Sequence, residues 1–125
     1  MNGSMDIKSK PCLDDKMVIV ITSDQFGQGE KELSENLMKS FIYSLTEVNP
    51  RPDTLIFLNR GVFLTTEDST VVESLRTLEA EGVEILSCGT CLNYYKLTEK
   101  LIIGTVSNMY NIVAKLNNTS NKIKI

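Results

Sequence analysis

Residues 83–91 have the sequence Val-Glu-Ile-Leu-Ser-Cys-Gly-Thr-Cys, an apolar run that leads directly into two cysteines three positions apart. Val83–Ser87 is short and mainly apolar, which is typical of a buried β-strand. Cys88 and Cys91 are therefore expected where this strand ends, and a short turn or helix is expected to follow over residues 91–96. Any chemistry that the protein performs is predicted to lie at this cysteine pair.

Similar apolar runs alternate with helical patterns along the rest of the chain. This alternation is typical of βαβ units and a mainly parallel sheet, so it predicts an α/β domain. The expected strands are Met17–Thr22, Thr54–Leu58, Val83–Ser87 and Leu101–Gly104. The expected helices cover about 30–46, the segment from near Thr70 to Gly82, and a last segment capped by Ser107. The alternating tail Lys122–Ile125 could pair at a sheet edge or fray, and the sequence leaves both open.

Apolar spacing and capping residues indicate how the helices lie against the sheet. In the first helix, a stripe at i, i+4 spacing is expected to face the core, widened by Met38 and Ile42; its members are Leu33, Leu37, Phe41 and Leu45. In the second, Thr70-Val-Val-Glu73 resembles a capping box and Gly82 suits the C′ position. In the last, the i, i+3, i+4, i+7 pattern predicts a buried face of Met109, Ile112, Val113 and Leu116.

Length and composition restrict the class of protein. The chain has 125 residues, 42% of them apolar, and a net charge of −3. This mild acidity argues against a nucleic-acid surface, and no run approaches the ~20 apolar residues of a membrane span. The N-terminus lacks the pattern of a secretory signal, so a cytoplasmic location is expected. Residues 1–16 are polar and aperiodic, and we predict a flexible leader or linker there, followed by one domain over residues 17–125.

Histidine is absent from the chain, and cysteine occurs three times. Without histidine there is no Ser-His or Cys-His dyad and no imidazole metal ligand. An odd number of cysteines in a reducing compartment does not make a disulfide framework, and a closed zinc site needs four ligands. No metal and no cofactor are therefore predicted. The third cysteine, Cys12, is expected to be a linker thiol without a functional role.

Small or polar residues follow every predicted strand. Because ligands meet doubly wound α/β domains at the carboxyl ends of the strands, these residues are expected to converge on one rim of the sheet. After the four strands, in order, they are Thr22, Ser23 and Asp24; Asn59, Arg60 and Gly61; Ser87 and Cys88; Gly104 and Thr105. The first six of these, together with Gly89 and Thr90, are the candidates for a substrate pocket. The alternative is that they are ordinary polar loop residues.

The spacing of Cys88 and Cys91 permits three kinds of chemistry. A thiolate at a helix N-terminus is stabilised by unpaired backbone N–H groups, and the second sulfur can attack whatever is bonded to the first. The pair could carry a transferable sulfur as a persulfide, exchange electrons as a dithiol, or supply two metal ligands. Thioredoxin-type chemistry is disfavoured because the pair follows the third strand and no proline occurs after Pro52. Packing of two small apolar side chains is the remaining alternative.

The segment Ser87-Cys-Gly-Thr-Cys-Leu-Asn-Tyr-Tyr95 resembles the YedF-type selenium-metabolism proteins, which belong to the DsrE/F-like sulfurtransferase-like superfamily. Thr22–Asp24 and Ser107–Ile112 share the resemblance, which extends over Met17–Leu116. It implies a three-layer α/β/α sandwich with a mostly parallel five-stranded sheet, and self-association into dimers, trimers or hexamers. Full-length YedF-type proteins carry a further N-terminal TusA-like domain with a Cys-Pro motif, and nothing in this sequence matches that domain.

The resemblance also implies a role for each cysteine. Relatives pass sulfur as a persulfide on a cysteine directly after the third strand, the position of Cys88, so Cys88 is expected to carry the sulfur. Cys91 has no counterpart in the simplest relatives and is expected to resolve or tune the persulfide. The predicted function is a sulfurtransferase-like sulfur or selenium carrier that self-associates and meets sulfur donor and acceptor proteins. A non-enzymatic oligomeric binding or redox-sensing module, and a dithiol oxidoreductase, stay open as alternatives.

Overall fold

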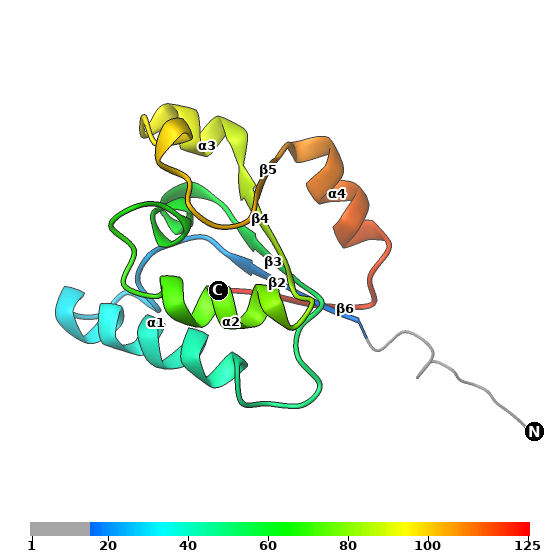
Figure 1. The fold of residues 1–125 in the computed structure, drawn as a ribbon, viewed down its shortest axis with the longest axis horizontal. Coiled ribbons are helices and arrows are strands. Elements are labelled where there is room, and N and C mark those ends of the chain that lie inside the picture. The colour runs from blue at the N-terminus through cyan, green and yellow to red at the C-terminus, as the bar shows by residue number, and fades with distance from the viewer. Residues whose placement is uncertain (1–15) are drawn as a thin grey trace, which may run out of the picture.

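The computed structural model describes residues 16–125, which form a five-stranded sheet with helices on both faces (Figure 1). The order across the sheet is β5-β4-β3-β2-β6, and every pair of neighbours runs parallel. The strands are β2 (Met17–Ile21), β3 (Thr54–Phe57), β4 (Glu84–Cys88), β5 (Thr105–Ser107) and β6 (Asn121–Lys124). The predicted α/β class with a parallel five-stranded sheet is therefore confirmed. Residues 1–15 of the predicted leader, Cys12 among them, lie outside the described residues.

The inner strands β4, β3 and β2 have layers packed on both of their faces, because alternate side chains of a strand point to opposite sides of the sheet. On one face the sheet packs against helices α1 (Lys31–Leu45) and α2 (Val72–Ala80); the strand residues in that core are Ile19, Ile21, Leu55, Phe57 and Ile85. On the other face it packs against α4 (Met109–Asn117); the core there contains Val18, Val20, Ile56, Leu86 and Ile112. Figure 1 shows α1 and α2 together and α4 apart from them, which gives the three layers.

The buried face of α1 agrees in part with the predicted stripe. Ser34, Met38, Ile42 and Leu45 are the buried residues, and Phe41 is partly buried against the same core. The prediction is wrong for Leu33 and Leu37, which are 55% and 44% exposed. Each of them precedes a buried residue by one position, and one position corresponds to about 100° around the helix.

The fourth strand is displaced from its predicted position. Residues 101–104 are not a regular strand: Leu101 forms an isolated antiparallel bridge with Thr66, and β5 begins only at Thr105. Gly104 has φ +79 and passes so close to β4 that a Cβ would lie 2.5 Å from the carbonyl oxygen of Ile85. The most apolar residues thus precede the strand, and Gly104 and Thr105 stand at its beginning. They do not belong to the rim that holds Cys88.

The predicted helix caps are partly correct. At the end of α2, Gly82 has φ +98, its N–H donates to the carbonyl of Glu79, and the next N–H, of Val83, donates to the carbonyl of Leu78. This is the Schellman pattern that a C′ glycine permits. At its start the capping box does not form: the helix begins at Val72, and the side chain of Ser69 accepts from the N–H of Val71.

The last helix is capped one residue later than predicted, and its buried face is narrower. The Asn108 side chain, not Ser107, accepts a hydrogen bond from the N–H of Asn111 at 2.8 Å. Ile112 is buried, whereas Met109 and Val113 are each 54% exposed. Leu116 is partly buried and packs against the same cluster as Ile112, so two of the four predicted residues face the sheet.

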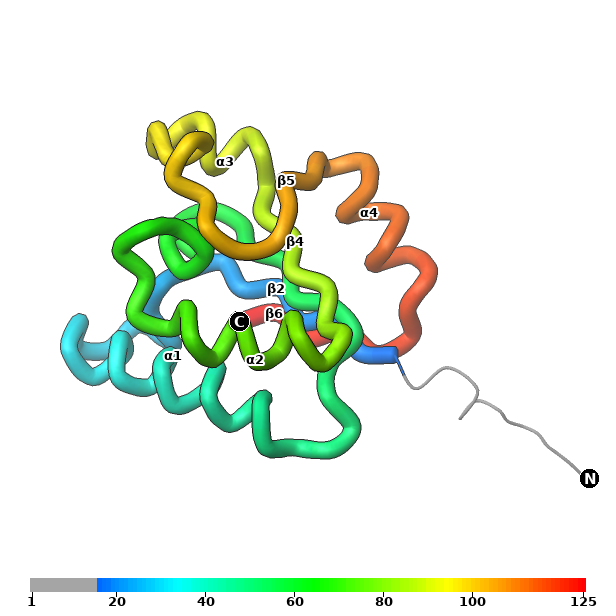
Figure 2. The backbone as a smooth tube through the Cα atoms, in the orientation of Figure 1, coloured from blue at the N-terminus to red at the C-terminus, as the bar shows by residue number. Residues whose placement is uncertain are grey.

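The tail pairs rather than frays. Residues 121–124 form β6, parallel to β2, with Met17 opposite Asn121 and Val20 opposite Lys124. The N–H of Ile125 also donates to the carbonyl of Val20 at 2.8 Å. Figure 2 follows the chain from α4 to this edge of the sheet, beside β2. No helix within residues 16–125 combines the length and the apolar character needed to cross a membrane.

Candidate functional site

The cysteine pair lies at the carboxyl end of β4, as the sequence predicts. Cys88 is both the last residue of this strand and the N-cap of helix α3 (Gly89–Tyr94), which begins two residues earlier than expected. A Cβ at Gly89 would lie 3.0 Å from the Val106 side chain and 3.3 Å from the carbonyl of Ser107. A glycine at this position thus lets the turn into α3 pack closely against β5.

The two thiols differ in their surroundings. Cys88 is only 3% exposed and belongs to the apolar cluster between the sheet and α4. Cys91 is half-buried and packs against both clusters of the core. Both are free cysteines. Cys91 is therefore the member of the pair that solvent and small reagents reach first.

Cys91 accepts a hydrogen bond from the other side of the rim. The backbone N–H of Asn59 donates to its Sγ with an N···S distance of 3.1 Å. Asn59 is the first residue of the 3-10 segment η2 (Asn59–Thr65) and has φ +49. Gly61 in the same turn lies so close to the end of β2 that a Cβ would stand 2.2 Å from the carbonyl oxygen of Ile21. The chain after β3 is thus held against β2, with an amide directed at the Cys91 sulfur.

These surroundings raise the pKa of the Cys91 thiol above its ordinary value. Burial is the largest cause, and hydrogen bonding and charge interaction with Cys88 raise the pKa further, whereas the N–H of Asn59 lowers it. Cys91 is accordingly a thiol rather than a thiolate at neutral pH. A protonated thiol is a poor nucleophile, so the second cysteine of the pair is slow to react under these conditions.

Arg60 follows Asn59 in the chain, and its side chain binds Asp24 and two aromatic rings. Its guanidinium donates to both carboxylate oxygens of Asp24, at 3.3 Å and 3.1 Å. It also lies 4.5 Å from the ring centroid of Phe63 and 5.9 Å from that of Tyr95. Tyr95 is partly buried and packs against the core on the α1 and α2 face of the sheet, whereas its neighbour Tyr94 is 77% exposed.

A buried pair of hydroxyl groups, missed in the sequence, fixes the residue before Cys88. Thr65 Oγ1 donates to the carbonyl of Val62 at 3.0 Å and lies 2.8 Å from Ser87 Oγ. A threonine hydroxyl has one proton, so Ser87 is the donor between the two hydroxyls. This bond ties η2 to the end of β4. A serine at the end of an apolar strand indicates that its buried hydroxyl has a hydrogen-bonding partner. Nothing in the sequence identifies Thr65 as that partner.

The remaining pocket candidates are not brought to the thiols by any described contact. Thr22 Oγ1 donates to the carbonyl of Ile125 at 2.8 Å, and Ser23 Oγ accepts from the N–H of Gln25. Thr90 is exposed on α3. Thr22 and Ser23 thus shape the loop after β2. Asn59 contacts Cys91 directly, and Gly61 lies in the same turn against the end of β2.

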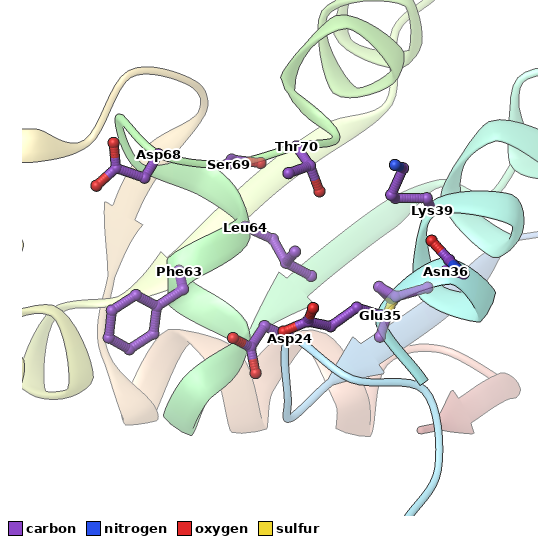
Figure 3. A pocket seen from close by; sticks show the side chains of 10 residues that line it. Asp24, Glu35, Asn36, Lys39, Phe63, Leu64, Asp68, Ser69 and Thr70 are labelled. Carbon is purple, nitrogen blue, oxygen red and sulfur yellow. The ribbon is translucent and has the colours of Figure 1, made fainter. Parts of the chain in front are cut away.

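A cavity of about 320 Å³ adjoins the site (Figure 3). Its lining includes Asp24 and Phe63, which also contact Arg60, but neither cysteine. Figure 3 shows Glu35 entering from α1 and Asp68 from the connection to α2. Of the sequence-predicted pocket residues, only Asp24 lines this cavity. Within residues 16–125, no three Cys, Asp or Glu side chains are grouped so that they could hold a metal ion.

Comparison with known proteins identifies the fold and the family. The fold resembles the ychN protein from E. coli, with a TM-score of 0.67 and 18% identity over 88% of this chain and 98% of that one. It also resembles a protein of unknown function, MTH1491 from Methanobacterium thermoautotrophicum, with a TM-score of 0.67 and 20% identity over 90% of this chain and 100% of the other. No curated protein matches the sequence. The sequence model of the DsrE/DsrF-like family matches residues 15–125, and the chain therefore belongs to that family.

Proposed function

We propose that this protein is a sulfur carrier that holds a transferable sulfur atom as a persulfide on Cys88, with Cys91 as a second thiol that limits the lifetime of the persulfide. The observation that carries the proposal is the pair of free, adjacent thiols at the carboxyl end of β4, one of them in contact with a backbone donor. Membership of a family associated with sulfur relay supports it.

The chemistry of loading and delivery needs no oxidant. The Cys88 thiolate attacks the outer sulfur of a donor persulfide, so a new S–S bond forms on Cys88, the donor's S–S bond breaks, and the donor leaves as a thiolate. Delivery reverses this, as an acceptor thiolate attacks the outer sulfur and Cys88 leaves. Neither step consumes an external oxidant or reductant. The carrier therefore needs one nucleophile and no cofactor.

Cys91 offers a competing reaction. Its thiolate can attack the inner sulfur of the Cys88 persulfide, which releases hydrosulfide and closes a Cys88–Cys91 disulfide. Here the Cys91 sulfur is oxidised from a thiolate to a disulfide, and the outer sulfur of the persulfide is reduced to hydrosulfide. Because the pKa of Cys91 is raised, chiefly by burial, this loss is slow at neutral pH. The raised pKa thus favours a carrier over a dithiol reductant.

The burial of Cys88 restricts which donors can load it. Cys88 is only 3% exposed, whereas Cys91 is half-buried. A donor must therefore present its sulfur on a narrow extension, or the short helix α3 must move. In a cell such donors and acceptors would be proteins of a sulfur or selenium pathway in the cytoplasm, as the likeness of residues 87–95 to YedF-type proteins suggests.

A dithiol oxidoreductase or redox sensor is the second candidate. The position of two free cysteines three residues apart, at the junction of β4 and α3, favours it, because neighbouring thiols can close a disulfide. The experiment that separates the two candidates is mass spectrometry of the protein after exposure to a small persulfide donor. A carrier gains one sulfur atom on the peptide that contains Cys88 and keeps this ability when Cys91 is replaced by serine. A dithiol protein requires both cysteines.

A further inference from the structure

The amide of Asn59, which donates to the Cys91 sulfur, belongs to a residue with an unusual backbone conformation. Its φ of +49 lies in the left-handed region, which residues other than glycine seldom adopt and asparagine tolerates best. In this conformation the N–H donates to Cys91 Sγ at 3.1 Å. Such outliers at a functional site persist when the surrounding structure fixes them.

Two backbone contacts fix the turn that contains Asn59. The N–H of Leu58 donates to the carbonyl of Ile21 at 3.0 Å, and the N–H of Gly61 donates to the carbonyl of Leu58 at 2.7 Å. A Cβ at position 61 would stand 2.2 Å from the same Ile21 oxygen. At the far end of η2, the Thr65 hydroxyl accepts from Ser87, the residue before Cys88. The donor and the cysteine pair are thus positioned by the same rigid segment.

A hydrogen bond from an amide stabilises a sulfur anion more than a neutral thiol. We propose that the peptide N–H of Asn59 is a positioning group that sets the ionisation of Cys91 and, through it, the rate at which Cys91 removes sulfur from Cys88. The second half of this proposal rests on the proposed carrier function. The first half concerns Cys91 alone and is tested without any sulfur transfer.

Other titratable groups on the elements around Cys91 act differently. The neighbouring Cys88 thiol, at the junction of β4 and α3, raises the pKa of Cys91. Arg60, on η2, is bound to Asp24 and lies over the rings of Phe63 and Tyr95. Replacement of Cys88 by serine removes the Cys88 thiol, which otherwise titrates beside Cys91. In that background the amide of Asn59 is the contact that lowers the pKa of Cys91.

The experiment measures the rate of iodoacetamide alkylation against pH in the Cys88→Ser protein. The Cys91 peptide is followed by mass spectrometry, so that Cys12 does not interfere. Asn59→Val places a β-branched residue where φ is positive, and the peptide is expected to rotate away from the sulfur. The midpoint for Cys91 should then move to higher pH. Asn59→Gly keeps both the N–H and the positive φ, so Cys91 should have the same midpoint as in the Cys88→Ser protein without a change at residue 59.

Lys96 provides a matched control for strain. It has φ +59 at the end of α3, and its N–H donates to the carbonyl of Asn93 rather than to a thiol. Lys96→Val should leave the Cys91 midpoint in place although it introduces the same kind of strain. An unchanged midpoint in Asn59→Val, or an equal shift in Lys96→Val, would overturn the proposal.

A backbone ester at residue 59 covers the case in which Asn59→Val does not fold. The ester replaces the N–H by an oxygen atom and retains the side chain. It should raise the Cys91 midpoint, and an unchanged midpoint would again overturn the proposal. Failure of Cys88 to accept sulfur would reject the carrier function and leave this titration result standing, so the two claims fail separately.

Discussion

Cys88 and Cys91 have different environments although they are three residues apart. Cys88 is enclosed by the apolar layer beneath α4, whereas Cys91 is half-buried and hydrogen-bonded to the Asn59 amide. In the proposed carrier, a persulfide on the enclosed sulfur would be shielded from solvent thiols. The neighbouring Cys91 would then be its principal competitor, and the protonation of Cys91 would set the lifetime of the persulfide.

The first prediction follows from this protonation. Because the pKa of Cys91 is raised, chiefly by burial, its thiolate fraction is small at neutral pH and grows as the pH rises towards that pKa. Decay of the Cys88 persulfide, measured as released sulfide, should therefore accelerate between about pH 7 and about pH 10. The Cys91→Ser variant should lack this acceleration. A decay rate with the same pH dependence in both proteins would exclude attack by Cys91.

The sequence locates the cysteine pair but not its hydrogen-bonding partners. Apolar residues before Cys88 are enough to predict a strand that ends there. The role of Asn59 was beyond sequence reasoning because it acts through its backbone N–H, whose direction depends on φ. Thr65 was missed because its partner, Ser87, is 22 positions away in the sequence and only the fold brings them together.

The limits of a strand can be predicted from the sequence where burial determines them. They cannot be predicted where backbone geometry determines them. β2 and β3 are buried on both faces and were expected within a residue of their observed ends. The prediction for β5 lies four residues too early, because two of its three residues are exposed and the turn at Gly104 determines where pairing begins. The prediction for helix α1 has the correct limits and most of the buried face, but it includes Leu33 and Leu37, because apolar spacing alone does not specify the rotation of the helix.

The turn between β3 and η2 gives a prediction about stability. Gly61→Ala places a Cβ that would collide with the Ile21 carbonyl oxygen, which is backbone and cannot turn aside. The variant should lose about 1–3 kcal/mol of unfolding free energy in urea titration. Gly29→Ala is the control, because its Cβ would meet the nearest atom, Ser34 Oγ, at 3.9 Å. Equal unfolding free energies of the two variants would show that the turn accommodates the added Cβ without loss of stability.

One group of exposed apolar side chains lies at the β5 edge of the sheet, apart from those on α1. The edge strand β5 and the neighbouring α4 expose Val106, Met109, Tyr110 and Val113, each at 52–81%. Exposed apolar groups beside an open sheet edge are typical of contacts between protein chains. Gly89, next to Cys88, packs directly against Val106. An interface here would therefore lie close to the cysteine pair.

This arrangement supports the predicted self-association. Light scattering at tens of micromolar protein should report a mass above that of the monomer. Val106→Lys, which places a charge on the edge strand, should reduce that mass. Tyr43→Lys is a control, because this residue is 58% exposed on α1, in the layer on the other face of the sheet. A monomer in the wild-type protein would reject the prediction.

Sulfur loading of the single-cysteine variants tests the central claim most directly. After exposure to a small persulfide donor at neutral pH, mass spectrometry should find one added sulfur atom on Cys88 in the wild-type protein and in Cys91→Ser. Cys88→Ser should remain unloaded, because Cys91 is protonated at this pH and lacks the carrier role. Equal loss of loading in both variants would contradict the account and indicate a dithiol protein instead.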